Sequence, residues 1–321
     1  MVKPDLLMTG PMMAMIQEQL AQRFTVHKLW EAADKEAFLR QLAPSVVAFA
    51  SGSHVPCDPA LMGRFPGLKI VSSFGVGYDH VDAAWAGQNG IVVTNTPDVL
   101  NEEVADTALG LLLCTMRQFP QTDRYLRAGK WLEKPYPLTT TLRDRKVGIL
   151  GLGRIGKAIA KRLEAFGLPV VYHGRSEQKD VAYRYYPSLV EMAKDVNVLM
   201  IVAPGGASTN KIVNREVLDA LGADGVVINV GRGSVIDEAA LIEALKTKTI
   251  LSAGLDVFED EPKVPAELIA MDHIVLFPHV GSASVHTRNG MAQLVVDNLV
   301  SWADGKGPLT PVAETPWPAR G

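Results

Sequence analysis

Residues 147–156 read Val-Gly-Ile-Leu-Gly-Leu-Gly-Arg-Ile-Gly, and this stretch decides the fold of the chain. A short apolar run, typical of a buried strand, leads directly into three glycines spaced as G-x-G-x-x-G: Gly151, Gly153 and Gly156. A helical pattern follows over residues 157–166. In this order the first glycine permits a tight turn, the second a close approach to a pyrophosphate, and the third close packing of helix on strand. The stretch therefore predicts a dinucleotide-binding unit with the phosphates at the N-terminus of the helix.

Short apolar runs alternate with helical patterns along the chain, which indicates parallel α/β construction. The strands predicted in the first third cover residues 5–9, 45–50, 69–73 and 91–94. Those predicted in the middle cover residues 146–150, 169–173, 196–202, 225–230, 251–256 and 273–277. These runs predict two doubly wound parallel-sheet domains with a cleft between them, a flavodoxin-like substrate domain and a six-stranded Rossmann nucleotide domain.

The pattern changes at residues 94–98, which we interpret as the boundary between the two domains. A long apolar helix is predicted over residues 101–119, with Asn101 as its cap. A second long helix near the C-terminus has apolar side chains at helical spacing, and we expect it to return to the first domain. Residues 308–321 hold four prolines and predict an extended tail. The predicted domains are therefore residues 1–98 with 287–321, and residues 99–286.

Composition excludes several classes of function. The chain has 321 residues, 47% hydrophobic residues and a net charge of −3, so nothing indicates a nucleic-acid footprint. No signal peptide or spanning segment is visible in the sequence. The two cysteines predict no disulfide framework, and no spacing of histidines or cysteines indicates a metal site. We expect a cytoplasmic protein that binds small molecules rather than nucleic acid or a membrane.

Three side chains follow predicted strands at their carboxyl ends, where ligands of open α/β sheets bind. They are Arg232, Glu261 and His279. The rigid fork of an arginine grips both the carboxylate and the carbonyl oxygen of a 2-keto acid. A histidine donates a proton near neutral pH, and a carboxylate beside it orients the imidazole. The three side chains therefore predict reduction of a keto acid by hydride transfer, with His279 as the general acid.

The chain resembles the D-isomer-specific 2-hydroxyacid dehydrogenase family over most of its length, and within it the glyoxylate/hydroxypyruvate and hydroxyphenylpyruvate reductases. The resemblance is carried by Ser72-Ser-Phe-Gly-Val-Gly-Tyr-Asp79, Thr94-Asn-Thr-Pro-Asp98, Val104-Ala-Asp-Thr107 and Pro278-His-Val-Gly-Ser282. It implies that Arg232 binds the substrate, that His279 is the acid/base and that Glu261 pairs with His279. It also implies that the backbone N–H groups of Val76 and Gly77 hold the substrate carboxylate, and that Asp256 lies near the nicotinamide.

The strand after the glycine motif ends without the acidic residue that an NAD enzyme uses for the ribose 2′-OH. Arg175 and Ser176 stand there instead, and both suit a 2′-phosphate. We therefore predict that NADP(H) is preferred and that NAD(H) remains possible. Relatives show Pro-x-Thr where this chain has residues 204–209, a departure that leaves the contacts of this loop open. The further predicted cofactor contacts are Thr107, Arg154, Ile155, Pro204, Thr209, Val230, Arg232, Asp256, His279 and Gly281, with the three glycines.

Other functions remain open from the sequence. A hydroxyphenylpyruvate reductase or a phosphoglycerate dehydrogenase has the same fold, although the chain shows no regulatory domain. A formate dehydrogenase is disfavoured because Glu261 stands where that enzyme has glutamine. A non-enzymatic dinucleotide sensor, such as a corepressor, is the alternative outside the enzymes. The apolar helix 101–119 and the aromatic residues Trp131 and Tyr136 predict a homodimer. In related reductases an aromatic residue of this region reaches the active site of the partner subunit, and packing in the interface is the alternative role.

Overall fold

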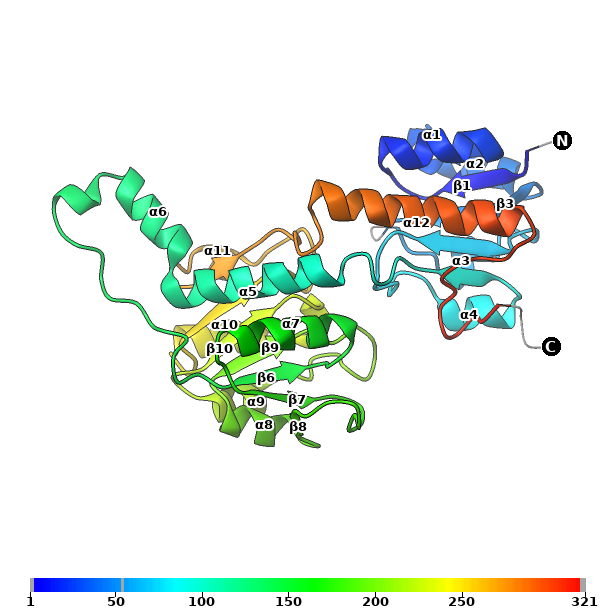
Figure 1. Ribbon diagram of the computed structural model, residues 1–321. Coiled ribbons are helices and arrows are strands. Elements are labelled where there is room, and N and C mark those ends of the chain that lie inside the picture. Colours follow the sequence, from blue (N-terminus) through cyan, green and yellow to red (C-terminus); the bar gives the residue numbers. More distant parts are fainter. Residues whose placement is uncertain (1–2, 53–54, 318–321) are drawn as a thin grey trace. The chain divides into compact units, whose positions relative to one another are not determined.

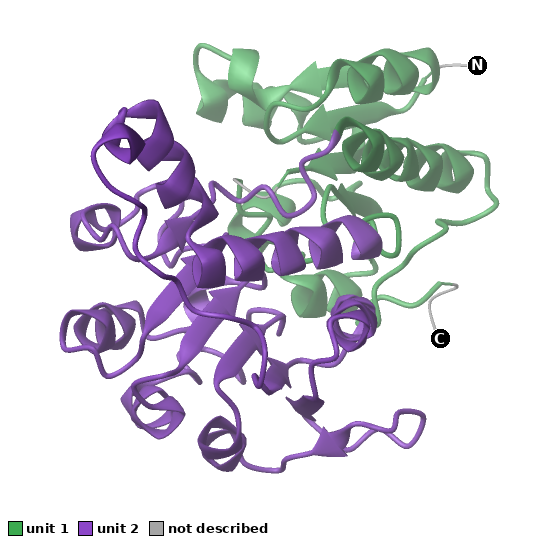
Figure 2. Ribbon diagram, turned by 60° about the vertical axis from the view of Figure 1, so that its left-hand side comes forward, with its two compact units in different colours: residues 1–100, 285–321 green, residues 101–284 purple. Residues whose placement is uncertain are grey.

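The computed structural model describes residues 3–52 and 55–317, and the chain divides into two compact units (Figures 1 and 2). Unit 1 consists of residues 1–100 and 285–321, and unit 2 of residues 101–284. The predicted domain limits lie within two residues of these limits. Both units are α/β structures with parallel sheets, so the predicted fold class is confirmed. Within the described residues no helix has the length and apolar composition that a membrane span needs.

Unit 1 is built on a five-stranded parallel sheet of order β2-β1-β3-β4-β5, which is the flavodoxin-like order. The four predicted strands are found within one residue at each end, and β2 is an additional edge strand. The strands are β1 (Asp5–Met8), β2 (Thr25–Lys28), β3 (Val46–Ser51), β4 (Ile70–Ser73) and β5 (Val92–Thr94).

Helices cover both faces of the unit 1 sheet because alternate strand residues point to opposite sides. Leu6, Ala48 and Ile70 pack against α1 (Ala14–Arg23) and α12 (Val285–Ala303). On the other face, Leu7, Phe49, Val71 and Val93 pack against α2 (Lys35–Leu42), α3 (Pro59–Met62) and α4 (Ala83–Gln88). A short helix η1 (Leu29–Glu31) joins β2 to α2. The last long helix therefore belongs to the core of unit 1.

Part of the predicted tail is fixed to unit 1. Pro311 forms an antiparallel bridge with Thr94, and the N–H of Val312 donates to the carbonyl oxygen of Val93 at 2.9 Å. The side chain of Val312 is 5% exposed and belongs to the core beside α4. Residues 318–321 of the predicted tail lie outside the described residues.

Unit 2 has a seven-stranded parallel sheet of order β12-β11-β10-β9-β6-β7-β8. The six predicted strands are all present, but the predicted number is wrong because β8, of two residues, extends the edge beyond β7. The order reverses between β6 and β9, so the carboxyl ends of these strands flank a topological switch point. The strands are β6 (Val147–Leu150), β7 (Val170–His173), β8 (Arg184–Tyr185), β9 (Val198–Ile201), β10 (Val226–Asn229), β11 (Ser252–Leu255) and β12 (Val275–Leu276).

Helices also cover both faces of this sheet. On one face lie α5 (Asn101–Arg117) and α7 (Arg154–Ala165), and α5 approaches β11 so closely that a Cβ on Gly254 would lie 2.4 Å from Oγ1 of Thr115. The other face packs against α8 (Leu189–Asp195), α9 (Arg215–Leu221) and α10 (Glu238–Lys246). The remaining short helices of unit 2 are η2 (Lys130–Leu132), η3 (Gly233–Val235) and α11 (Ala266–Ile269).

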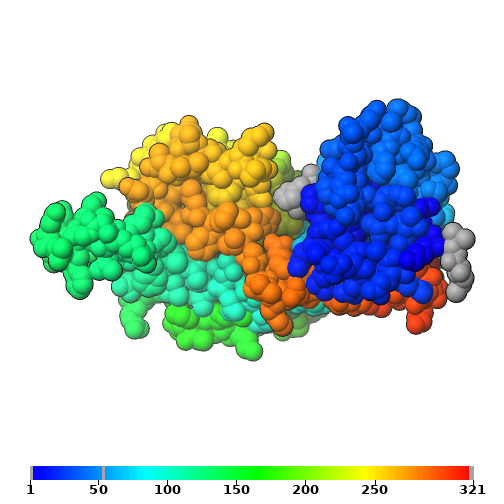
Figure 3. Space-filling view, turned by 90° about the horizontal axis from the view of Figure 1, so that it is seen from above, coloured from blue at the N-terminus to red at the C-terminus, as the bar shows by residue number. Residues whose placement is uncertain are grey.

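The segment after α5 stands off the body of unit 2 (Figures 1 and 3). The helix predicted over residues 101–119 ends at Arg117, because Gln118 adopts a left-handed φ of 53° and a second helix, α6 (Phe119–Arg127), starts there. Gln121 anchors α6 by donating to the carbonyl oxygens of Asp272 and Ile274. The segment exposes large apolar side chains, namely Phe119, Leu126, Trp131, Leu132 and Leu138.

Candidate active site

The residues predicted to act in unit 2 gather at one edge of its sheet, since all its strands are parallel. Each group follows the carboxyl end of a different strand: residues 151–156 follow β6, 175–176 follow β7, and 204–209 follow β9. Residues 230–232 follow β10, Asp256 follows β11, and His279 and Gly281 follow β12. Thr107 lies on α5, and its hydroxyl donates to the carbonyl oxygen of Gly281 at 3.2 Å.

The glycine motif has the geometry that a dinucleotide requires. Gly151 adopts a φ of +98°, and a Cβ there would lie 2.8 Å from the backbone nitrogen of Ala203. A Cβ on Gly156 would lie 2.3 Å from the carbonyl oxygen of Gly151, so helix and strand pack closely only without a side chain. A Cβ on Gly153 would meet open space. Arg154 and Ile155 begin α7 directly after Gly153, and the N-terminus of this helix favours an anion.

The loop after β7 carries Arg175 and Ser176, which are both exposed. Three hydrogen bonds shape the loop around them. The hydroxyl of Tyr185 donates to the carbonyl oxygen of Gly174 at 3.2 Å, and the hydroxyl of Tyr172 accepts from the N–H of Gln178 at 2.7 Å. The amide of Gln178 donates to the carbonyl oxygen of Leu152 at 2.6 Å. The loop is thereby tied to the glycine motif, and it presents a cation and a hydroxyl beside it.

A carboxylate near this loop, that of Asp180, is already paired with a lysine. Lys157 lies 2.6 Å from Asp180, and this hydrogen bond is the main reason that the pKa of Asp180 is lowered. Asp180 is therefore an anion that a lysine already pairs. The residues present fit a dinucleotide with a 2′-phosphate, because the end of β7 offers Arg175 and Ser176 where a ribose-binding carboxylate would stand.

The turn that holds Arg232 is fixed by a buried asparagine. Asn229 is 1% exposed, its amide donates to the carbonyl oxygen of Arg232 at 3.0 Å, and its Oδ1 accepts from the N–H of Gly231 at 3.0 Å. The Nη1 of Arg232 donates to the carbonyl oxygen of Gly231 at 2.8 Å. A Cβ on Gly233 would lie 1.9 Å from the carbonyl carbon of Phe258, so this turn packs directly on the loop that carries Glu261.

Glu261 and His279 form a hydrogen-bonded pair. Nδ1 of His279 lies 2.6 Å from Oε2 of Glu261, and the other carboxylate oxygen accepts from the N–H of Phe258 at 3.0 Å. Burial raises the pKa of Glu261, but the hydrogen bond and charge of His279, with the N–H of Phe258 and the charge of Arg232, outweigh burial and lower it. Glu261 is thus an anionic acceptor that orients the imidazole and leaves Nε2 for a substrate.

Asp256 shapes the turn on which His279 lies. His279 has a left-handed φ of 52°, rare for a residue other than glycine. The carbonyl oxygen of Asp256 accepts from the N–H of His279 at 2.9 Å, and its two carboxylate oxygens accept from Val280 and Gly281 at 2.7 and 2.8 Å. Burial raises the pKa of Asp256 despite these two backbone N–H groups. Three successive N–H groups thereby bind one residue and fix the direction of the imidazole.

Two further predicted contacts, Pro204 and Thr209, lie in the loop after β9, and a third, Val230, lies directly after β10. The hydroxyl of Thr209 donates to the carbonyl oxygen of Pro204 at 2.7 Å and closes the loop on itself. Val230 is 9% exposed, and its N–H donates to the carbonyl oxygen of Ile201 at 3.1 Å. The loop therefore has a defined shape although its sequence departs from the family pattern.

In unit 1, Val76 and Gly77 lie in the loop after β4. The carbonyl oxygen of Gly75 accepts from the N–H of Thr96, and that of Val76 accepts from Nδ2 of Asn95, both at 2.8 Å. Asn95 and Asn229 were both missed as functional residues by the sequence analysis. The available signals were an asparagine at a strand end that is followed by Val-Gly-Arg-Gly in one case and by Thr-Pro in the other.

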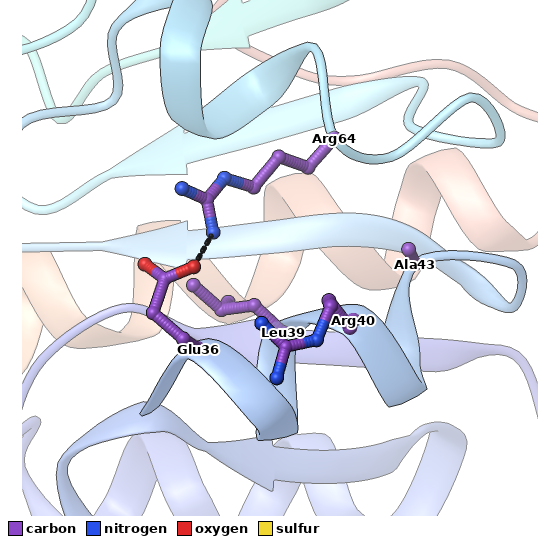
Figure 4. A pocket seen from close by; sticks show the side chains of 5 residues that line it. All are labelled: Glu36, Leu39, Arg40, Ala43 and Arg64. Atoms are coloured by element: carbon purple, nitrogen blue, oxygen red, sulfur yellow. Dashed lines mark hydrogen bonds and ion pairs between the residues drawn. The ribbon is translucent and has the colours of Figure 1, made fainter. Parts of the chain in front are cut away.

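A surface hollow elsewhere in unit 1 holds none of the predicted residues (Figure 4). It is lined by Glu36, Leu39, Arg40, Ala43 and Arg64, and Arg64 pairs with Glu36 at 2.7 Å. The Arg64 and Glu36 side chains are 39% and 61% exposed, so water screens this pair. We assign the hollow no role in binding.

Comparison with known proteins identifies the relatives of this chain. The family model described as D-isomer specific 2-hydroxyacid dehydrogenase, NAD binding domain, matches residues 109–281. Glyoxylate/hydroxypyruvate reductase A HPR2 of Arabidopsis thaliana is 47% identical over 95% of this chain and 98% of its own length. Hydroxyphenylpyruvate reductase of Plectranthus scutellarioides is 45% identical over the same shares. An NADPH-dependent glyoxylate/hydroxypyruvate reductase of Sinorhizobium meliloti, solved with NADP and malonate, is 50% identical with a TM-score of 0.94 and covers 99% of both chains.

Proposed function

The chain belongs to the D-isomer specific 2-hydroxyacid dehydrogenase family, and we propose that it is an NADPH-dependent reductase of a small 2-keto acid such as glyoxylate or hydroxypyruvate. The observation that carries the proposal is the hydrogen-bonded pair of His279 and Glu261 at the same sheet edge as Arg232. The names of the Arabidopsis and Sinorhizobium relatives support this substrate class.

In this proposal each side chain has a distinct role. Arg232 binds the carboxylate and the carbonyl oxygen of the keto acid, and the N–H groups of Val76 and Gly77 bind the carboxylate. Glycines 151, 153 and 156 and the first turn of α7 hold the cofactor phosphates, and Asp256 fixes the turn of His279. When bound, the reduced nicotinamide supplies the hydride. Nε2 of His279 donates a proton to the carbonyl oxygen, which yields the 2-hydroxy acid and a neutral imidazole.

The first prediction tests this reaction. Addition of NADPH and a keto acid to the wild type should oxidise the cofactor, which is followed by its absorbance. His279→Ala should lower kcat by about 10²–10⁴-fold and leave cofactor binding nearly intact, since only the acid is lost. His27→Ala, which removes a half-buried histidine of the edge strand β2 that pairs with Asp5 in unit 1, is the matched control. Near-normal kcat in His279→Ala would contradict the assignment.

A panel of keto acids separates the substrate classes. The likeness to the Plectranthus hydroxyphenylpyruvate reductase makes hydroxyphenylpyruvate the second candidate substrate. We expect the highest kcat/KM for glyoxylate or hydroxypyruvate. Higher values for the aromatic keto acids would favour the second candidate, and cofactor binding without any turnover would favour a dinucleotide sensor.

The second prediction concerns the cofactor. Arg175 gains charge-assisted hydrogen bonds only from a 2′-phosphate, and the loss of such a bond costs about 1.5–3 kcal/mol. Arg175→Ala should therefore raise KM for NADPH by roughly 10- to 100-fold and leave KM for NADH almost unchanged. Arg215→Ala, which removes an exposed arginine of α9, is the control. Equal weakening of both cofactors, or a wild type that prefers NADH, would remove the NADPH assignment.

We also propose that the chain forms a homodimer through the segment of residues 119–138. Its five exposed apolar side chains form a surface that a monomer would leave in water. Trp131 is 66% exposed, whereas the hydroxyl of Tyr136 donates to Gln118 of its own chain at 2.9 Å.

A further inference from the structure

Two consecutive peptide units of the loop after β4 are held at their carbonyl oxygens. The N–H of Thr96 donates to Gly75, and the side-chain amide of Asn95 donates to Val76, both at 2.8 Å. In a trans peptide unit the C=O and the following N–H point in opposite directions. The N–H groups of Val76 and Gly77 therefore point away from residues 95 and 96. Residues 74–78, here called the carboxylate loop, thus present two adjacent donors on one side.

Asn95 is itself fixed by residues near the C-terminus. The hydroxyl of Thr310 donates to the carbonyl oxygen of Asn95 at 2.6 Å. Asn298 of α12 holds Thr310 in turn, because its Oδ1 accepts from the N–H groups of Leu309 and Thr310 and its Nδ2 donates to the Thr310 hydroxyl, all at 2.9 Å. A fourth bond, from Nδ2 to the carbonyl oxygen of Leu294 at 2.8 Å, uses the remaining capacity of this amide. The hydrogen bonds that lead from Asn298 through Thr310 to Asn95 are here called the relay. The side chain of Asn298 is 0% exposed, so the relay starts in the core of unit 1.

A second contact joins the same two segments. The hydroxyl of Tyr78, the last residue of the carboxylate loop, donates to Oε2 of Glu314 at 2.9 Å. Burial and this hydrogen bond raise the pKa of Tyr78 to about 12, so the phenol remains a donor at any pH used for assay. Directly after Glu314, the hydroxyl of Thr315 accepts from the N–H of Val93 at 2.8 Å and keeps the segment on β5.

We propose that residues 309–315, here called the C-terminal strap, position the carboxylate loop so that the N–H groups of Val76 and Gly77 receive the substrate carboxylate. The strap contacts the loop through Glu314 and, by way of Asn95, through Thr310. Thr310, Asn298 and Glu314 are then positioning residues of the keto-acid site. The inference rests on the proposed function, because it assigns these two N–H groups to a 2-keto acid.

Paired variants of the full chain test the inference. Thr310→Val removes the relay hydroxyl at nearly constant volume, and Thr310→Ser keeps it. Glu314→Ala removes the acceptor of Tyr78, and Glu314→Gln keeps an acceptor oxygen. Gln293→Ala is the matched control, because it removes an amide of α12 that bonds Gln19 and Asp297 rather than the strap. The measurements are KM for keto acid and for NADPH, inhibition by malonate, which carries carboxylates but cannot be reduced, and the melting temperature.

We expect KM for the keto acid and the inhibition constant of malonate to rise by about 2- to 12-fold in Thr310→Val and in Glu314→Ala. This range is the factor in binding affinity that one hydrogen bond contributes. KM for NADPH should change by less than about twofold, and Thr310→Ser, Glu314→Gln and the control should resemble the wild type. A purely structural strap would instead lower the melting temperature and leave the keto-acid KM unchanged.

Unchanged KM and malonate inhibition in folded Thr310→Val and Glu314→Ala would overturn the inference. If Thr310→Val does not fold, the two variants at the exposed Glu314 decide alone, and a rise that Glu314→Gln fails to reverse also counts against it. A wild type that turns over no keto acid with NADPH overturns the proposed function, and the inference with it. An active wild type with insensitive variants overturns the inference only.

Discussion

At the scale of single residues, the pKa values of two acids in the candidate site are shifted in opposite directions, although burial raises both. Asp256 is 1% exposed, and burial raises its pKa although two backbone N–H groups bind it. Burial also raises the pKa of Glu261, but the hydrogen bond and charge of His279, together with the charge of Arg232, reverse the net direction. The hydrogen bond to His279 and the neighbouring charges therefore keep Glu261 an anion that orients the imidazole.

The third prediction follows from the lowered pKa of Glu261. Its value in the unfolded chain is 4.5, so the ionised carboxylate contributes stability that is fully present above pH 4.5 and is lost as pH falls through the lower folded pKa. Glu261→Gln should therefore melt below the wild type at about pH 6, and the two melting temperatures should converge below pH 4.5. Glu243→Gln, an exposed change on α10, is the control. A difference that persists unchanged into acid would show that packing, not charge, stabilises this position.

The sequence could predict the residues that act by their own side-chain chemistry. Arg232, Glu261 and His279 each follow an apolar run, and parallel strands bring such positions to one edge. Asn229 and Asn95 act by binding backbone groups of a turn or a loop, and such partners depend on the folded path of the chain. Their residue type alone is also typical of ordinary turns.

At the scale of elements, apolar runs predicted the buried strands, and the misses have physical causes. The edge strands β2 and β8 are half exposed, so neither leaves a continuous apolar run. Pro120 directly follows the predicted end of α5. A proline at such a position is compatible with the end of one helix and also with the first turn of the next helix. The structure shows the second case, in which α6 begins after the left-handed Gln118.

The fourth prediction concerns β8 and the loop it supports. Tyr185→Phe removes only the hydroxyl that holds the carbonyl oxygen of Gly174, next to Arg175. A loosened loop should lower the preference for NADPH over NADH by about 2- to 12-fold, the effect of one hydrogen bond. Tyr183→Phe is the matched control, because its hydroxyl bonds Glu164 of α7 instead. The measurement is the ratio of kcat/KM for NADPH to kcat/KM for NADH. If this ratio is the same in both variants, the Tyr185 hydroxyl does not influence the choice of cofactor.

At the scale of the whole molecule, hydrogen bonds within unit 1 join residues that lie far apart in the sequence. Thr310 and Asn298 hold Asn95, more than 200 residues away, so no local pattern could predict the relay. Periodicity did predict that the last helix has an apolar face, and Asn298 lies on that face as a buried amide. The strap that it binds covers β5, which would otherwise be an exposed edge.

The fifth prediction concerns assembly. Leu132 and Leu138 are 94% and 102% exposed and Trp131 is 66% exposed, so one projecting segment of unit 2 places three large apolar side chains in water. A two-fold dimer would bury the same segment of both chains. Light scattering should give twice the mass of one chain for the wild type, and Leu132→Asp should shift it toward one chain by placing a charge in the interface. Phe166→Asp, an exposed apolar position at the end of α7, should remain dimeric. A wild type with the mass of one chain at micromolar concentration would rule out the dimer, and a Leu132→Asp variant as dimeric as the control would place the contact elsewhere.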